Sequence, residues 1–187
     1  MATSQLTEST LPADRAVDLA TIAGRLTLEN LPGRDLDPDE LRDLTASLAA
    51  DPDRWAHLVG FDAQDRVFAS LHRDAHVDVW LLCWTPENDT GWHDHDISSG
   101  AVSVVAGELV ENNLTVGRGG VETRVGAGKA FAFGPEHIHR LNGAEAGSVS
   151  VHAYSPPLWR MGQYAVSDAG VLRRVSVSYA DELRPID

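Results

Sequence analysis

Four of the eight histidines occur in two pairs, and in each pair one residue separates the two imidazoles. The first pair is His93 and His95, within Gly-Trp-His-Asp-His. Residues two apart in an extended chain point to the same side, so both imidazoles would converge on one point. A metal site also needs a third ligand, and the second pair, His137 and His139, offers two candidates. The spacing predicts a histidine-based metal site, with hydrogen-bonded imidazoles as the alternative.

A second set of polar side chains alternates along one segment. Ser150, His152 and Tyr154 follow one another at intervals of two, so they share one face of an extended strand. Taken alone, this pattern is more typical of a strand with one polar face and a tyrosine bonded to a buried partner.

Trp80, Leu82 and Trp84 form a third alternating set. Large apolar side chains on one face of a strand are most often core residues. The intervening Cys83 would point the other way, as an inert buried thiol.

Two helices are predicted on the N-terminal side of these motifs. Apolar residues recur at intervals of three and four from Ala16 to Leu26, the spacing of one helix face. Further on, Asp37 precedes Pro38, a pair that suits a helix start, and apolar residues continue at helical spacing to Ala50. We therefore expect a second helix up to that residue.

From Phe61 onward the apolar spacing changes to two, in short valine-rich segments separated by Gly, Asn, Asp and Pro. Many short strands with turns between them are typical of a sandwich or a small barrel, which leaves few exposed strand edges. We predict a mainly β fold with two N-terminal α-helices packed on a barrel. The expected strands are 66–71, 77–84, 100–105, 108–116, 121–125, 129–133, 148–154 and 171–178.

Composition restricts the partners and the compartment. The 187 residues suit a single domain, and 15 basic against 28 acidic side chains give a net charge of −13, which argues against nucleic acid or an anionic membrane as partner. Cys83 is the only cysteine, so an intrachain disulfide and a cysteine-based zinc cluster are excluded. No signal or membrane-spanning segment is evident, and we expect a cytoplasmic protein. Residues 1–13 are expected to be a flexible leader and 14–187 one domain.

The histidine motifs resemble those of a known superfamily. The segment 91–107, which opens with Gly-Trp-His-Asp-His, and the segment 128–142, which contains Gly-Pro and His139, are similar to the two sequence motifs of the cupins. More narrowly, Leu-Cys-Trp, His-Asp-His, His-Arg and Ser-Val-His-Ala-Tyr-Ser-Pro-Pro resemble the cysteine dioxygenase family of thiol dioxygenases. The resemblance extends from Phe68 to Tyr164.

This resemblance implies a double-stranded β-helix barrel, or jelly roll, with one Fe(II) per chain. It also implies that Ser150 and His152 form a relay in which Tyr154 presents its hydroxyl group to the substrate. The implied metal ligands are His93, His95 and His139.

The residue types support this chemistry. Most cupins carry a glutamate ligand four or five residues after the second histidine, where this chain has Ser99 and Gly100. Three neutral imidazoles leave the charge of a ferrous ion uncompensated and one face open. A substrate thiolate would supply that charge, and dioxygen bound beside the sulfur would give a sulfinate. The predicted activity is therefore a thiol dioxygenase, acting on a small thiol and dioxygen.

Two positions depart from the family pattern. Mammalian members have a cysteine, cross-linked to the active-site tyrosine, where this chain has Gly100, so Tyr154 is expected to lack a cross-link. The family also has an arginine that binds the cysteine carboxylate, two residues after an aromatic residue. The match at 68–71 puts Ser70 in that position, with Arg73 three residues away. The family match therefore does not identify a residue that binds the substrate carboxylate, and selectivity for L-cysteine does not follow from it.

L-Cysteine is the family's default substrate, but without that arginine a cationic or heteroaromatic thiol such as ergothioneine becomes a candidate, followed by 3-mercaptopropionate and cysteamine. The alternatives are a three-histidine zinc hydrolase or isomerase and a non-catalytic cupin that binds a small molecule. A monomer or a homodimer is expected. The residues predicted to bind substrate are Leu82, Trp84, Phe68, Ser70, Arg73 and Trp92.

Overall fold

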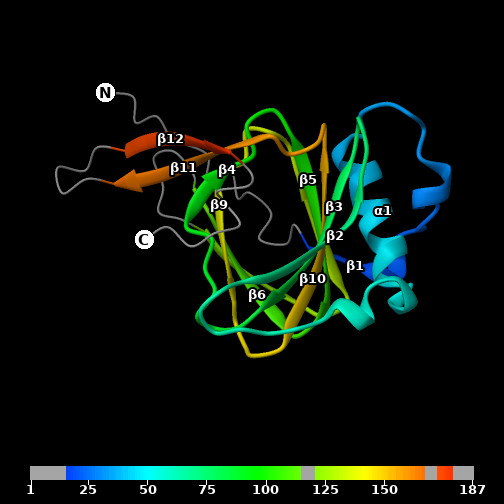
Figure 1. Cartoon of the computed structure of the whole chain (residues 1–187), viewed down its shortest axis with the longest axis horizontal. Helices are drawn as coiled ribbons and strands as arrows, with labels where there is room; N and C mark the ends of the chain where they lie inside the picture. The colour runs from blue at the N-terminus through cyan, green and yellow to red at the C-terminus, as the bar shows by residue number, and fades with distance from the viewer. Residues whose placement is uncertain (1–15, 115–120, 167–171, 179–187) are drawn as a thin grey trace, which may run out of the picture.

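The strands form two antiparallel sheets that face each other across the interior of a barrel, with one long helix outside (Figure 1). The computed structural model describes residues 16–114, 121–166 and 172–178, so the predicted leader lies outside the described residues. The first sheet contains, in spatial order, β1 (Val17–Asp18), β8 (Lys129–Phe133), β5 (Ser99–Ala106), β10 (Ser148–Ser155), β3 (Asp78–Trp84) and β2 (Val67–Arg73). The second contains β12 (Leu172–Ser178), β11 (Arg160–Val166), β4 (Trp92–Asp94), β9 (His139–Gly143), β6 (Glu108–Asn113) and β7 (Val121–Gly126).

This arrangement confirms the predicted mainly β jelly roll. Most predicted strands are present with small shifts at their ends; the predicted end at Val116 and the predicted start at Val171 lie outside the described residues. The strands β1, β4, β9 and β11 were not among the predicted segments. β4 has only three residues and β9 reads His-Arg-Leu-Asn-Gly, so pairing with neighbouring strands, and not local propensity, makes them extended.

The second predicted helix is confirmed as α1 (Pro38–Ala49). Asp37 accepts a hydrogen bond from the Glu40 backbone N–H at 2.9 Å, and the Glu40 carboxylate accepts one from the Asp37 N–H at 3.1 Å. This reciprocal pair satisfies two backbone donors at the start of the helix. The described helices include none that is both long and apolar enough to cross a bilayer. The remaining helical turns are 3-10 turns at Leu19–Thr21, Leu28–Asn30, Pro52–Arg54 and Ala56–Leu58.

The helix predicted from Ala16 to Leu26 is wrong, because that segment holds β1 and a single 3-10 turn. Gly24 has a left-handed backbone, with φ of +59°, which interrupts a right-handed helix. The carboxylate of Asp43 on α1 accepts hydrogen bonds from the backbone N–H of Gly24 at 2.8 Å and of Leu26 at 2.6 Å. A side chain of α1 thus satisfies donors that a helix would have used, and the segment is tied to α1.

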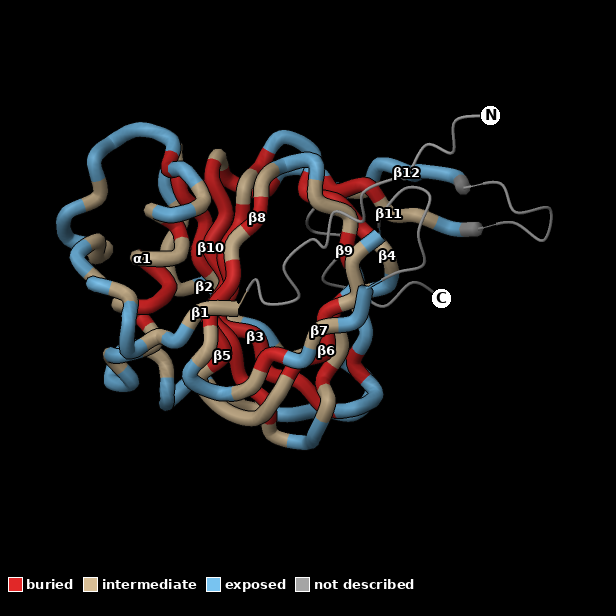
Figure 2. The backbone as a smooth tube through the Cα atoms, turned by 180° about the vertical axis from the view of Figure 1, so that it is seen from behind, coloured by how far each residue is buried: buried red, intermediate tan, exposed pale blue. Residues whose placement is uncertain are grey.

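The first sheet separates two hydrophobic cores. On β3, Leu81 and Cys83 face α1, whereas Leu82 and Trp84 face the barrel interior. Figure 2 shows β10 and β3 buried along most of their length, which agrees with cores on both faces. Cys83 is buried as predicted, and burial raises the pKa of its thiol. The α1 leucines in the outer core are Leu41, Leu44 and Leu48.

Candidate metal centre

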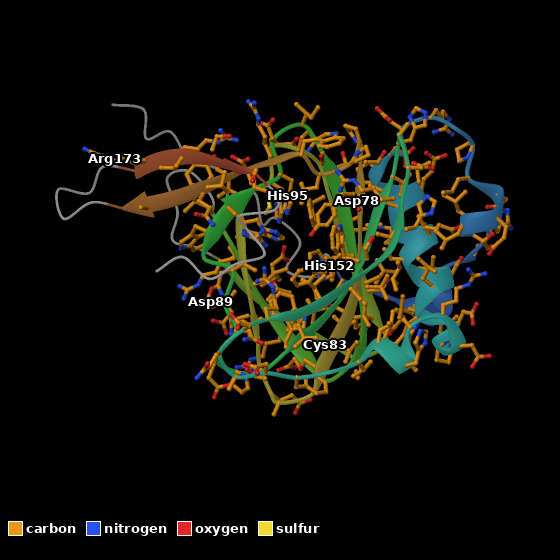
Figure 3. All side chains as sticks on the ribbon, viewed as in Figure 1. Asp78, Cys83, Asp89, His95, His152 and Arg173 are labelled. Carbon is orange, nitrogen blue, oxygen red and sulfur yellow. The ribbon has the colours of Figure 1, made fainter. Side chains whose placement is uncertain are left out.

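Strand pairing brings the two histidine motifs together. His93 lies on β4, His95 follows that strand directly, and His139 begins β9, where it pairs with His93 in register. The ring centroids are 4.6 to 5.0 Å apart, and the candidate ligand nitrogens lie within 4.8 Å of one another. All three side chains are buried, and Figure 3 shows His95 between the two sheets. We call these three residues the histidine cluster.

The nitrogen atoms of the cluster suit one shared ion. Nδ1 of His93 donates to the carbonyl of Gly91 at 3.1 Å, which leaves Nε2 as the coordinating atom of a neutral ring. Within the described part of the chain, neither nitrogen of His95 nor Nε2 of His139 has a hydrogen-bond partner. Buried polar atoms without partners are unfavourable, and a metal ion would satisfy one nitrogen of His95 together with Nε2 of His139. The donor set therefore fits a divalent cation held by three imidazoles.

Burial also keeps the cluster neutral. It lowers the pKa of His95 well below its usual value. It lowers the pKa of His139 to about 3, against an opposing effect of the hydrogen bond to Glu111. Neutral imidazole is the form that binds metals. Phe133 stacks on His95 with ring centroids 4.7 Å apart and closes one side of the cluster.

The other histidine of the second pair, His137, contacts Glu111 instead of joining the cluster. Nε2 of His137 donates to Oε1 of Glu111 at 2.9 Å, and Nδ1 of His139 donates to the same oxygen at 3.0 Å. Burial raises the pKa of Glu111, but the hydrogen bonds from His137 and His139 outweigh burial and lower the value to about 2. A carboxylate thus lies behind His139, although none occupies the usual cupin position at Ser99 or Gly100.

Asp94 lies between the first two histidines and holds β4 in place. Its carboxylate accepts hydrogen bonds from the Gly162 backbone N–H at 3.1 Å and from Oη of Tyr164 at 2.6 Å, both on β11. Nε and Nη2 of Arg174 on β12 donate to it at 2.7 and 2.8 Å. Burial raises the pKa of Asp94, but these bonds outweigh burial, and the pKa lies well below its ordinary value. The network fixes the short strand that carries His93.

Three side chains of β10 form a hydrogen-bonded chain inside the barrel. Oγ of Ser150 lies 2.8 Å from Nε2 of His152, and Nδ1 of His152 lies 3.2 Å from Oη of Tyr154. The indole N–H of Trp84 donates to Oγ of Ser150 at 2.9 Å. The Tyr154 ring stacks on His95 with centroids 5.2 Å apart, so the chain ends beside the histidine cluster. We call Ser150, His152 and Tyr154 the β10 chain.

A small cavity lies beside the cluster and the β10 chain. Its volume is about 50 Å³. Arg66 is the only permanently charged side chain among the described residues of its lining, and its guanidinium carbon lies 5.2 Å from the centroid of the Trp84 ring. The other lining residues include Trp80, Leu82, His93, His152, Tyr154 and Leu158.

Two of the six residues predicted to bind substrate, Leu82 and Trp84, line this cavity. Of the remaining four, Phe68 is partly exposed and packs on Trp80 with ring centroids 5.7 Å apart. The four residues outside the lining are Phe68, Ser70, Arg73 and Trp92.

Arg73, the candidate three residues from the position of the missing arginine, lies outside the cavity lining. It pairs with the buried carboxylate of Asp78, and its Nη2 donates to the carbonyl of Leu158 at 3.3 Å. Its guanidinium carbon lies 4.5 Å from the centroid of the Trp159 ring. The register of β2 against β3 shifts between Ser70 and His72, which brings Arg73 opposite Asp78. Arg73 therefore fixes the loop after β10, and Arg66 is the arginine of the cavity.

Sequence reasoning missed Arg66 and Glu111. Arg66 is two and four residues before Phe68 and Ser70, so it shares their strand face, and this alternation was a usable signal. Glu111 alternates with Leu109 on β6, so a buried carboxylate could have been suspected. Its contact with His139 depends on the pairing of β6 with β9, which no local pattern reveals.

The two facing sheets and the buried histidine cluster define a metal-binding protein of the cupin class. The chain belongs to the cysteine dioxygenase type I family, whose profile matches residues 11–167. Membership assigns it to the dioxygenases at the level of the family.

Solved structures similar to this chain include double-stranded β-helix proteins. One is an uncharacterized conserved protein with such a domain from Klebsiella pneumoniae, at 13% identity over 64% of this chain and 91% of that chain, with a TM-score of 0.47. Another is an RmlC-like cupin protein from Desulfovibrio desulfuricans, at 17% identity over 53% of this chain and 90% of that chain, with a TM-score of 0.45. No curated protein matches the chain.

Proposed function

We propose that this protein is a non-heme iron(II) thiol dioxygenase that converts a small thiol to a sulfinate. The reaction consumes one thiol and one dioxygen and places both oxygen atoms on the sulfur, so that one sulfinic acid forms and no other reductant is needed. The observation that carries the proposal is the histidine cluster beside the β10 chain, with His93 of the cluster and His152 and Tyr154 of the β10 chain lining one cavity.

The histidine cluster would hold one Fe(II) per chain through three neutral imidazoles. When bound, this ion would bring a thiolate sulfur and dioxygen together and favour the thiolate over the thiol. The imidazoles carry no charge, so the thiolate would add the first negative ligand, which favours a thiol over an alcohol or an amine as substrate.

Arg66 is proposed to bind an acidic group of the substrate. A guanidinium forms paired, charge-assisted hydrogen bonds with a carboxylate. The Arg66 guanidinium lies over the aromatic face of Trp84. In that position it would repel a cationic thiol and occupy the surface on which such a thiol would stack. The acidic-group contact favours 3-mercaptopropionate or L-cysteine over cysteamine, which has no carboxylate, and the occupied Trp84 face disfavours the stacking of ergothioneine.

The cavity also favours a small substrate. Its volume of about 50 Å³ corresponds to only a few water molecules. Leu82 and Trp80 give it apolar walls, which would exclude water from the reacting sulfur.

The β10 chain is proposed to direct a proton toward the substrate. The indole N–H of Trp84 can only donate, so it occupies one lone pair of Ser150 Oγ. With the Ser150 hydroxyl donating to Nε2 of His152, the neutral imidazole donates from Nδ1 to Oη of Tyr154. Burial and the nearby charge of Arg66 lower the pKa of His152 well below its usual value, which keeps this ring neutral. In this arrangement Oη of Tyr154 accepts from His152, and the hydroxyl group would act as the proton donor at the cavity that Tyr154 lines.

Metal analysis of anaerobically purified protein, followed by dioxygen uptake with the four thiols, tests the proposal. We expect one iron per chain, equal consumption of thiol and dioxygen, and a sulfinate that carries two labelled oxygen atoms from ¹⁸O₂. Bound zinc with no dioxygen uptake would contradict the proposed dioxygenase and favour a hydrolase or isomerase instead. Thiol binding to the iron form without turnover would indicate a non-catalytic cupin.

A further inference from the structure

Glu111 is a buried carboxylate whose described ion-pair partners are two imidazoles. It lies on β6, its side chain is 1% exposed, and its Oε1 accepts from both His139 Nδ1 and His137 Nε2. The described residues provide no lysine or arginine within ion-pair distance of it. Oε2 has a longer contact of 3.4 Å with Nδ2 of Asn113.

An anion in this position needs compensation. A carboxylate removed from water is unfavourable unless it is paired with a positive charge or well hydrogen-bonded. The rings of His139 and His137 are packed with their centroids 4.8 Å apart, and Phe133 contacts both. A cation bound at Nε2 of His139 would lie across one imidazole ring from the Glu111 carboxylate.

We infer that Glu111 is a positioning residue of the metal centre, which fixes His139 with its proton on Nδ1, aims Nε2 at the metal and supplies the negative charge that the three ligands lack. Most cupins have a glutamate ligand that supplies negative charge directly to the metal. Here the Glu111 carboxylate would supply that charge without binding the metal, through its hydrogen bond with Nδ1 of His139. The inference rests on the metal-binding role proposed above for His139. Partners of this kind orient histidine ligands and raise their basicity.

Two substitutions separate the hydrogen bond from the charge. In Glu111→Gln, the amide oxygen can still accept from Nδ1 of His139, but the negative charge is absent. In Glu111→Met, both the acceptor and the charge are absent. His137→Gln is the matched control, because it removes the other imidazole and leaves the Glu111–His139 contact in place.

The affinity for Zn²⁺, a redox-inert probe, is measured on the folded metal-free proteins by competition with a chromophoric chelator. We expect an affinity about tenfold lower in Glu111→Gln and up to about a hundredfold lower in Glu111→Met. His137→Gln should lose less than either variant. In the iron form, Glu111→Gln should have a higher midpoint potential than the wild type, because a nearby anion stabilises the ferric ion more than the ferrous ion.

Thermal unfolding of the metal-free proteins shows whether a loss of affinity comes from misfolding, and if Glu111→Met does not fold, Glu111→Gln carries the test. Wild-type affinity and potential in folded Glu111→Gln would overturn the inference while the proposed function stands. A loss in His137→Gln as large as in Glu111→Met would also overturn it, because the contact with His139 would then not be the one that acts. A wild-type protein that binds no divalent metal would instead refute the proposed function.

Discussion

Phe133 occupies the space into which a side chain at position 100 would extend. A Cβ atom built on Gly100 would lie 2.4 Å from Cζ of Phe133 and 3.1 Å from Cδ1 of Tyr154. Gly100 pairs in register with both residues, because β5 lies between β8 and β10. The only cysteine of the chain, Cys83, lies in the outer core. The space beside Tyr154 that a cross-linking cysteine would use is therefore filled by an aromatic ring.

Gly100→Cys should destabilise the protein and not create a cross-link. The added side chain would displace Phe133, and overpacking of this kind lowers the free energy of unfolding by about 1–3 kcal/mol. Urea unfolding measures the loss, with Gly126→Ala as control because no atom lies within 4 Å of a Cβ at that position. A variant of wild-type stability whose mass is lower by two hydrogens, with Tyr154 linked, would show this packing argument to be wrong.

His139→Ala should abolish stoichiometric iron, whereas His137→Ala should retain most of it. His139 groups with His93 and His95, whereas His137 bonds the Glu111 carboxylate and lies against the His139 ring, outside that group of three. Metal content after anaerobic reconstitution is the measurement. The assignment of the third ligand is reversed if His137→Ala loses the iron and His139→Ala keeps it.

Tyr154→Phe should retain the metal and lose turnover by about tenfold to a thousandfold, which is the range for removal of one positioned proton donor. The substitution leaves the ring that stacks on His95 and removes only the hydroxyl bonded to His152. Iron content and dioxygen uptake are compared in the same preparation. Wild-type turnover in this variant would remove the hydroxyl from the mechanism.

Arg66→Gln should lower kcat/KM for 3-mercaptopropionate by about tenfold to a hundredfold, because a hydrogen bond between charged groups contributes about 1.5–3 kcal/mol. The value for cysteamine, which has no acidic group, should fall much less. Arg173→Gln is the matched control, since Arg173 is exposed on β12 (Figure 3). If ergothioneine or cysteamine is the best substrate and Arg66→Gln leaves every rate constant unchanged, the anion contact is absent.

Asp94→Asn should lower the free energy of unfolding by about 1–3 kcal/mol, because Arg174 and Tyr164 lose a charged acceptor in a partly buried network. The matched control is Asp96→Asn. Asp96 is 41% exposed and 3.3 Å from Arg174, so its loss should have little effect. Chemical unfolding of the metal-free proteins measures both. Equal losses in the two variants would show that the fall in the free energy of unfolding comes from removing any negative charge near Arg174, and not from releasing β4.

Local spacing predicted the parts of the site that belong to single segments. Alternation placed His93 with His95 and put Ser150, His152 and Tyr154 on one face, and each set does share a face in the fold. These predictions succeeded because the period of two is a property of any extended chain.

Features set by long-range contacts were not predictable in this way. The helix expected up to Leu26 failed because Asp43, on another element, bonds the backbone of Gly24 and Leu26. Ser70 and Arg73 lie outside the cavity lining, and a register shift between β2 and β3 places Arg73 opposite Asp78.

Strand β10 contributes alternate residues to two different interiors. Ser150, His152 and Tyr154 face the cavity side, and the intervening Val149, Val151 and Ala153 pack toward α1. A slip of one residue would exchange the two sets, burying three polar groups against leucines and leaving apolar side chains beside the histidines. The same register of β10 is therefore needed for both the outer core and the lining of the cavity. A misaligned chain would therefore lose the outer core and the arrangement of side chains around the cavity together.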